Sequence, residues 1–184
     1  ASMITYLVTG GAGFIGSHVS EALLNRGDKV IGLDSLNDYY AVSNKEQNVA
    51  LLKSKRGFTF IKGDICNIEL VEEIFNSNQI SHVAHIAARA GVRPSIELPL
   101  LYEEVNVRGT SILLEAARKH SVENFVLTSS SSVYGNSINV PFREDDSATD
   151  KPISPYAATK KAAEVLGYTF HHLYGLNVNV IRPF

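Results

Sequence analysis

The chain has 184 residues, of which 45% are apolar and 20% charged, with a net charge of −2 at pH 7. A chain of this length buries roughly 70% of its unfolded surface on folding, so its core needs no metal or disulfide to hold it. The charge offers no basic excess to neutralise nucleic acid. The sequence also has no apolar run near the roughly 20 residues that span a bilayer, and a single cysteine, Cys66. We therefore expect no nucleic-acid partner, no membrane span and a reducing compartment, the cytoplasm.

Short β-branched apolar runs alternate with longer helical patterns along the chain. The predicted strands are residues 4–9, 29–34, 59–62, 82–86, 124–129 and 177–181. The predicted helices are residues 14–26, 43–54, 67–77, 99–120 and 155–174, with Gly27 and Gly175 placed to end two of them. Nearly continuous apolar strands suit a parallel sheet that is covered on both faces. The pattern predicts an α/β fold, a doubly wound parallel Rossmann sheet in the order 3-2-1-4-5-6 with helices on both faces.

A glycine-rich loop follows the first strand directly and opens the first helix. Gly10, Gly13 and Gly16 have the spacing G-x-x-G-x-x-G, with Phe14 and Ile15 between the last two. The first glycine permits a tight turn, the second a close approach of the backbone to a pyrophosphate, and the third close packing of helix on strand. The helix N-terminus then offers N–H groups and a partial positive charge. The loop predicts a dinucleotide site.

Asp34 stands at the end of the second strand, 24 residues beyond Gly10. A carboxylate at this place accepts hydrogen bonds from adenosine ribose hydroxyls and repels a 2′-phosphate. No arginine follows in residues 35–38, so the pattern favours NAD over NADP. The alternative is an aspartate that only caps the end of a strand.

Tyr156 and Lys160 lie four residues apart on the last predicted helix. Residues i and i+4 share one helix face, so the phenol and the ammonium can converge on one point. A free tyrosine has a pKa near 10, but an adjacent ammonium and an oxidised nicotinamide both favour the phenolate. The pair therefore predicts a general base, although the same spacing also occurs on ordinary surface helices.

Together with the glycine loop, this pair makes the chain similar to the extended short-chain dehydrogenase/reductase superfamily over essentially its whole length. Further matching segments are residues 63–65, 85–88, 106–110 and 128–135. The resemblance implies that Ser130, three residues before Val133, completes a catalytic triad with Tyr156 and Lys160. It also implies that the cofactor is contacted by Asp64 and Ile65 near the adenine, by Ala87 and Asn106 along its length, and by Lys160 at the nicotinamide ribose.

The resemblance extends to NAD-dependent nucleotide-sugar enzymes, in which a hydride first leaves a sugar carbon for NAD. Family dehydratases carry an Asp–Glu pair at the positions of Ser131 and Ser132, and decarboxylases usually carry a glutamate at the second. Serine at both positions leaves return of the hydride to the opposite face, which is epimerisation. Residues 34–40 and 87–95 look most like the UDP-glucuronate 4-epimerase branch, which implies a UDP-sugar substrate. Arg89 or Arg93 either contacts its anionic group or is a solvated loop charge.

Two alternatives stay open: an NAD-binding module without turnover, and another nucleotide-sugar oxidoreductase such as a dehydratase or decarboxylase. We expect residues 4–184 to form one NAD-binding domain, residues 1–3 to be a cloning remnant and start, and the C-terminal substrate domain of the family to be absent. The chain alone is then expected to have little or no activity. Helices near residues 99–120 and 155–174 pair across a homodimer in many relatives, so the resemblance also implies a dimer.

Three structural alternatives concern single residues. Ser129 to Ser132 could be a polar strand end, although four serines at a strand's carboxyl edge favour a site. Four histidines could suggest a metal centre, but they lack acidic or cysteine companions at ligand spacing, so we expect no metal; they are His82, His85, His171 and His172. Cys66 is expected to be a packed small side chain.

Overall fold

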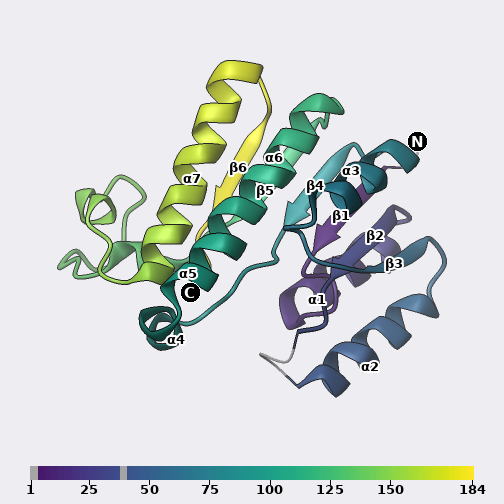
Figure 1. Cartoon of the computed structure of the whole chain (residues 1–184), viewed down its shortest axis with the longest axis horizontal. Coiled ribbons are helices and arrows are strands. Elements are labelled where there is room, and N and C mark those ends of the chain that lie inside the picture. Colours follow the sequence, from purple (N-terminus) through teal and green to yellow (C-terminus); the bar gives the residue numbers. More distant parts are fainter. Residues whose placement is uncertain (1–3, 38–40) are drawn as a thin grey trace.

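The computed structural model describes residues 4–37 and 41–184. Residues 1–3, expected to be a remnant, and residues 38–40 of the resembling segment 34–40 lie outside the described residues. Six parallel strands form one sheet in the order β3-β2-β1-β4-β5-β6 (Figure 1). They are β1 (Thr5–Thr9), β2 (Lys29–Asp34), β3 (Phe58–Lys62), β4 (His82–His85), β5 (Asn124–Thr128) and β6 (Val178–Ile181). The predicted doubly wound order is confirmed.

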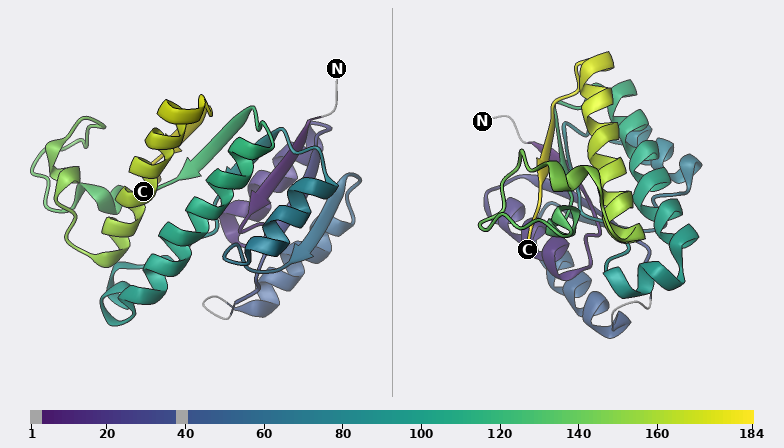
Figure 2. Two further views of the ribbon diagram at one scale, coloured as in Figure 1. Left: turned by 45° about the horizontal axis from the view of Figure 1, so that its top comes forward. Right: turned by 90° about the vertical axis from the view of Figure 1, so that its left-hand side faces the viewer.

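Helices cover both faces of this sheet, as predicted. They are α1 (Phe14–Asn25), α2 (Val42–Lys53), α3 (Ile68–Ser77), α4 (Val92–Glu97), α5 (Pro99–Tyr102), α6 (Gly109–Lys119) and α7 (Pro155–Tyr174). Three short turns accompany them: η1 (Glu103–Arg108), η2 (Ser131–Tyr134) and η3 (Ser147–Asp150). Helices α6 and α7 lie side by side across β5 and β6 (Figures 1 and 2). Among the described residues, no helix has the length and apolar character that a membrane crossing requires.

The core consists of two apolar clusters, one on each face of the sheet. The larger cluster joins α3, α6 and α7 to the strands, through side chains such as Phe75, Leu113 and Ala163. The smaller cluster joins α1 and α2 through Leu24 and Leu52. In β1, Leu7 belongs to the larger cluster and its neighbour Val8 to the smaller, because successive strand side chains point to opposite faces.

The predicted helix over residues 99–120 is present as an unbroken helical stretch from Pro99 to Lys119, but its middle part is π-helical. Between β4 and β5, the chain forms α4, then α5, and continues through the π-helical turn η1 into α6. The amide of Asn106 in η1 bonds to both backbone groups of Arg89. A π-helical turn accommodates one extra residue and is frequent at functional sites. Gly175 ends α7 with a positive φ of 70°, as predicted.

Candidate active site

A hollow of about 670 Å³ opens at the carboxyl ends of the paired strands β1 and β4, where the order of the strands in the sheet reverses. Ligands of doubly wound sheets bind at this switch point. Its lining includes most of the predicted site residues, namely Gly10, Gly13, Phe14, Ile15, Gly16, Asp34, Ala87, Tyr156 and Lys160. Asp64 and Ile65 line an adjoining hollow that shares Gly10, Asp34 and Ala87 with it. The fold thus brings the two ends of the chain's predicted site together.

The three glycines of the G-x-x-G-x-x-G motif are needed for different structural reasons. Gly10 has a φ of +69°, and a Cβ there would lie 2.9 Å from the backbone nitrogen of Ala87. A Cβ on Gly16 would overlap the carbonyl oxygen of Gly10. A Cβ on Gly13, by contrast, would meet only that oxygen, at 3.4 Å. The protein itself requires glycine at 10 and 16, whereas the space beside Gly13 is open to a ligand.

Helix α1 presents its N-terminus to this hollow. Gly13 is the N-cap, no side chain caps the first turn, and no acidic residue lies in it. The first N–H groups of a helix lack partners within the helix, and they carry a partial positive charge. Phe14 and Ile15 are exposed at the mouth of the hollow. The arrangement suits an anion such as a pyrophosphate.

Asp34, the last residue of β2, is buried beside the glycine loop. Its Oδ2 accepts a hydrogen bond from the backbone N–H of Ala12 at 3.1 Å, and its Oδ1 accepts one from that of Leu36 at 2.8 Å. Lys45 on α2 is only 8% exposed, lines the hollow and places its Nζ 3.4 Å from Oδ1. No local sequence pattern marks Lys45 as a site residue, since a lysine within a helix is ordinarily solvated.

Tyr156 and Lys160 occupy the first turns of α7. The helix begins where the Ser154 hydroxyl accepts the N–H of Ala157, as expected of an N-cap. Tyr156 is half-buried and lines the hollow. Lys160 is 6% exposed and donates from Nζ to the carbonyl of Thr128 at 2.9 Å. Burial lowers the pKa of Lys160 to about 8, against an opposing effect of Glu164.

The serines after β5 divide between two environments. Ser130 is buried outside the lining of the hollow, and its hydroxyl accepts the N–H of Ser132 to cap η2. Ser129 does line the hollow, at 3% exposure, and its hydroxyl has no hydrogen-bond partner among the described residues. An unpaired buried hydroxyl costs about 1–3 kcal/mol, so this atom fits a bound polar ligand. Counting back from Val133 selected Ser130 alone; the serine run was the only signal for Ser129.

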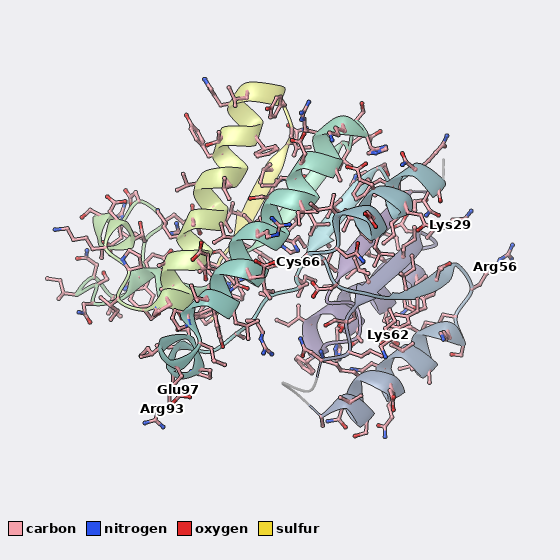
Figure 3. All side chains as sticks on the ribbon, viewed as in Figure 1. Lys29, Arg56, Lys62, Cys66, Arg93 and Glu97 are labelled. Carbon is pink, nitrogen blue, oxygen red and sulfur yellow. The ribbon has the colours of Figure 1, made fainter. Side chains whose placement is uncertain are left out.

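The remaining candidates lie outside this hollow. Arg93 is exposed on α4 and projects away from the fold (Figure 3). Arg89 is half-buried and lines the adjoining hollow with Asp64. Neither arginine lines the hollow that holds Tyr156. Burial raises the pKa of the Cys66 thiol to about 12, with Asp64 acting in the same direction, which fits a packed thiol.

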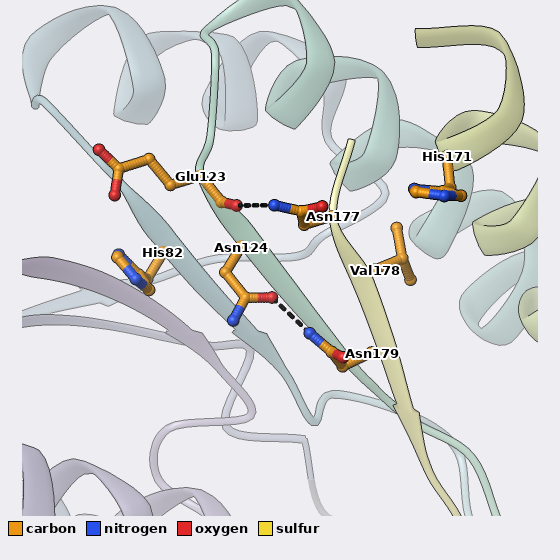
Figure 4. Close-up of a pocket in the computed structure, with 7 residues that line it drawn as sticks. All are labelled: His82, Glu123, Asn124, His171, Asn177, Val178 and Asn179. Carbon is orange, nitrogen blue, oxygen red and sulfur yellow. Dashed lines mark hydrogen bonds between the residues drawn. The ribbon is translucent and has the colours of Figure 1, made fainter. Parts of the chain in front are cut away.

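A second polar hollow lies at the amino ends of β4, β5 and β6, away from the glycine loop (Figure 4). Two asparagines from the start of β6 bond across to β5: Asn177 to the carbonyl of Glu123, and Asn179 to the side chain of Asn124. The ring of His171 is bonded to the carbonyl of Leu176. Within residues 4–37 and 41–184, no three histidine, cysteine or carboxylate side chains gather as a metal ion would require.

The fold and the site define a Rossmann dinucleotide-binding domain of the short-chain dehydrogenase/reductase class. The sequence profile of one family, described as GDP-mannose 4,6 dehydratase, matches residues 7–184. The chain therefore belongs to this family.

Several relatives carry more specific names. Over 97% of its length the chain is 50% identical to the UDP-glucuronate 4-epimerase of Thermodesulfobacterium geofontis, of which it covers 55%. Over 98% of its length it is 48% identical to UDP-glucuronate 4-epimerase 4 of Arabidopsis thaliana, of which it covers 41%. The chain thus spans about half the length of the curated relatives it matches.

Solved structures agree with these relatives in fold. The UDP-glucuronic acid 4-epimerase of Bacillus cereus, in complex with UDP-glucuronic acid and NAD, superposes with a TM-score of 0.87 at 34% identity. The match covers 97% of this chain and 56% of that one. A dTDP-glucose 4,6-dehydratase of Streptomyces venezuelae with NAD bound gives 0.87 at 34% identity, covering 97% and 55%. The same fold thus serves both epimerases and dehydratases.

Proposed function

We propose that this chain supplies the NAD-binding and proton-transfer groups of a nucleotide-sugar 4-epimerase that acts on UDP-glucuronate. One observation carries the proposal: a single hollow joins a glycine loop and Asp34 to Tyr156 and Lys160. A cofactor cradle that also contains a proton-transfer pair suits oxidation and reduction of a bound substrate. The relatives named as UDP-glucuronate 4-epimerases support the choice of reaction and substrate.

The residues of the hollow and of the adjoining hollow fit NAD, whereas Asn106 is buried outside both linings. The α1 N-terminus and Gly13 would hold the pyrophosphate, and Asp34 with Lys45 the adenosine ribose. The predicted contacts at the other positions are Asp64 and Ile65 at the adenine, Ala87 and Asn106 along the cofactor, and Lys160 at the nicotinamide ribose. When bound, NAD would supply a reversible hydride acceptor for the sugar carbon.

Proton transfer falls to Tyr156, whose phenolate oxygen would remove the proton of the sugar 4-hydroxyl. Lys160, with a pKa of about 8, is mostly charged at neutral pH and stands one helical turn after Tyr156. Ser130 is proposed to hydrogen-bond the same sugar oxygen. The unpaired hydroxyl of Ser129 is a second donor on the lining, available to the cofactor or the sugar.

Epimerisation is favoured over dehydration by Ser131 and Ser132. These positions match those at which the resemblance places the Asp–Glu pair of the dehydratases. Elimination of water needs an additional acid and base, and a serine hydroxyl supplies neither near neutral pH without activation. Return of the hydride needs only the groups already present.

The test is to incubate the protein with NAD and UDP-glucuronate and to measure UDP-galacturonate. The chain should first bind NAD by calorimetric titration. Conversion should then be measured for the chain and for a chimera that adds the remaining part of the T. geofontis relative, with Tyr156→Phe as the inactive control. Failure to bind NAD would contradict the cofactor assignment. A chimera that converts other UDP-hexoses but not UDP-glucuronate would contradict the substrate assignment.

We also propose a homodimer formed through α5 and α7. Leu100 on α5 is 79% exposed, and Val165 and Tyr168 on α7 are 54% and 69% exposed. Helices α5 and α7 pack against each other, and Val165 and Tyr168 gather with Val180, Ile181 and Phe184 along one hollow beside β6. Apolar side chains gathered on a surface in this way are typical of protein–protein contacts.

A further inference from the structure

A chain of buried polar side chains runs behind the candidate site and connects β1, β4, η1, α6 and α7. Its members are Thr9, His85, Thr110, Asn106 and Thr159, none of them more than 7% exposed. We propose that His85, held as the neutral Nε2–H tautomer between two threonine hydroxyls, is a positioning residue. It ties the glycine-loop side of the cofactor cradle to α7, which carries the Tyr–Lys pair. The inference rests on the proposed function only in naming NAD as the ligand of that cradle.

Thr9 determines the role of one ring nitrogen. Its hydroxyl oxygen accepts the backbone N–H groups of Ile86 at 3.0 Å and Ala87 at 3.1 Å. A hydroxyl has two lone pairs and one proton, so both lone pairs are used. The oxygen lies 2.7 Å from Nδ1 of His85, and only its proton is left for that bond. Thr9 therefore donates, and Nδ1 accepts without a proton of its own.

Thr110 determines the role of the other ring nitrogen. Its hydroxyl donates its single proton to the carbonyl of Asn106 at 2.7 Å. It lies 2.9 Å from Nε2 of His85, so in that bond it accepts and Nε2 carries the proton. In a doubly protonated ring, Nδ1–H would point at the Thr9 oxygen, whose two lone pairs already accept the N–H groups of Ile86 and Ala87. In the same direction, burial first and then the ammonium of Lys160 lower the pKa of His85 to about 3.

The series of hydrogen bonds continues from Thr110 to helix α7. The side-chain NH2 of Asn106 donates to the carbonyl of Arg89 at 3.0 Å and to the hydroxyl of Thr159 at 3.1 Å. Thr159 in turn donates to the backbone carbonyl of Tyr156 at 2.9 Å. The hydrogen bonds therefore end on the backbone of the predicted general base.

At its other end, this series of hydrogen bonds reaches the glycine loop of the cofactor cradle. Thr9 directly precedes Gly10, which is packed so closely on Ala87 that a Cβ would lie 2.9 Å from the Ala87 nitrogen. The same Thr9 hydroxyl holds the N–H of Ala87. Loss of the His85 bonds would thus release the end of β1 and the end of β4 from α7, on both sides of the hollow.

The tautomer is tested directly on the 15N-labelled chain by long-range 1H–15N correlation of the imidazole rings. The His85 signals are assigned by their loss in His85→Gln. We expect the Nε2–H pattern without titration between about pH 5 and 8, the range in which ordinary histidines titrate. An Nδ1–H pattern, or a protonated ring at about pH 6, would overturn the proposal.

Positioning is tested with a matched pair at Thr110. Thr110→Val keeps the shape and removes the hydroxyl, whereas Thr110→Ser keeps the hydroxyl. We expect NAD binding to weaken about tenfold in the valine variant, with the Nε2 15N shift moved by the loss of its acceptor, and both to recover in the serine variant. Thr149→Val is the control, because Thr149 is equally buried and hydrogen-bonded but is not part of the series of hydrogen bonds around His85.

Unchanged NAD binding in Thr110→Val would overturn the positioning role. If the unaltered chain does not bind NAD, the proposed function fails. The coupling of the cofactor cradle to α7 can still be measured without a ligand. The backbone amide shifts of Ile86 and Thr159 should then both change in Thr110→Val and recover in Thr110→Ser. Unchanged shifts at both amides would contradict the coupling of the cradle to α7.

Discussion

The carboxylate of Asp34 bonds to the protein backbone and also faces the hollow. Its oxygens accept the backbone N–H groups of Ala12 and Leu36, yet it also lies on the lining of the hollow. The buried ammonium of Lys45 stands 3.4 Å away. A carboxylate offers about four lone-pair sites, so Asp34 can still accept ribose hydroxyls. We therefore propose that the balance of charge between Asp34 and Lys45 sets the preference of the site between NAD and NADP.

Asp34→Asn should weaken NAD binding by roughly 1–3 kcal/mol, the scale of a lost hydrogen bond to a charged group. It should also narrow the preference for NAD over NADP, because the Lys45 ammonium is no longer neutralised beside the expected ribose position. Titration of both cofactors measures this, and the double variant Asp34→Asn/Lys45→Met should lose the gain in NADP binding. Unchanged NAD affinity in Asp34→Asn would refute the ribose role.

Lys160 should make stability depend on pH, because its pKa in the folded chain is about 8 against an ordinary 10.5. Between these values the unfolded chain binds more protons than the folded one, so the free energy of unfolding rises with pH. We expect the native chain to gain roughly 3 kcal/mol relative to Lys160→Met across this range. Urea unfolding at about pH 7.5, 9 and 10.5 measures the difference, and a constant difference would contradict the buried, desolvated ammonium.

At the scale of elements, the junction of β1 and α1 separates folding from binding. Gly16→Ala should destabilise the fold by about 1–3 kcal/mol, since its Cβ would overlap the Gly10 carbonyl. Gly13→Ala should leave the free energy of unfolding nearly unchanged, because Gly13 has a φ of −73° that alanine adopts, but should weaken NAD binding. Urea unfolding and NAD titration of both variants distinguish the effects. Equal loss of stability in both would contradict the assignment of Gly13 to the ligand.

The elements also show where sequence patterns succeed and where they fail. The prediction of α7 over residues 155–174 is confirmed residue for residue, because Pro155 after a serine cap and Gly175 in the left-handed conformation mark its ends locally. The prediction of a helix over residues 99–120 is confirmed in extent, because α5, η1 and α6 follow one another without a break from Pro99 to Lys119. The pattern did not predict that η1 is π-helical. In η1 the side chain of Asn106 bonds to the backbone of Arg89, 17 residues earlier in the chain, and no pattern within a helix window contains such a contact.

At the scale of the whole molecule, the large apolar side chains of Val165 and Tyr168 on α7 and of Leu100 on α5 are exposed. A stable dimer through α5 and α7 is therefore the proposed state. The charged double variant Val165→Glu/Tyr168→Glu should be monomeric by light scattering, because buried like charges oppose association. Its thermal unfolding should otherwise resemble that of a monomer of the native sequence at low concentration. A native chain that is monomeric at high concentration would contradict the dimer.

The sequence by itself determined the alternation of strands and helices, the glycine loop, Asp34 and the Tyr156–Lys160 pair. The elements, the glycine loop and the Tyr156–Lys160 pair depend on residues within a few positions of one another, and Asp34 depends on its place at the end of the second strand, so periodicity and spacing contain the information. Only the tertiary structure placed Lys45 beside Asp34, brought Ser129 to the hollow and set His85 between Thr9 and Thr110. Those contacts join residues up to 76 positions apart, and strand register and helix packing, rather than any local pattern, decide which distant side chains meet.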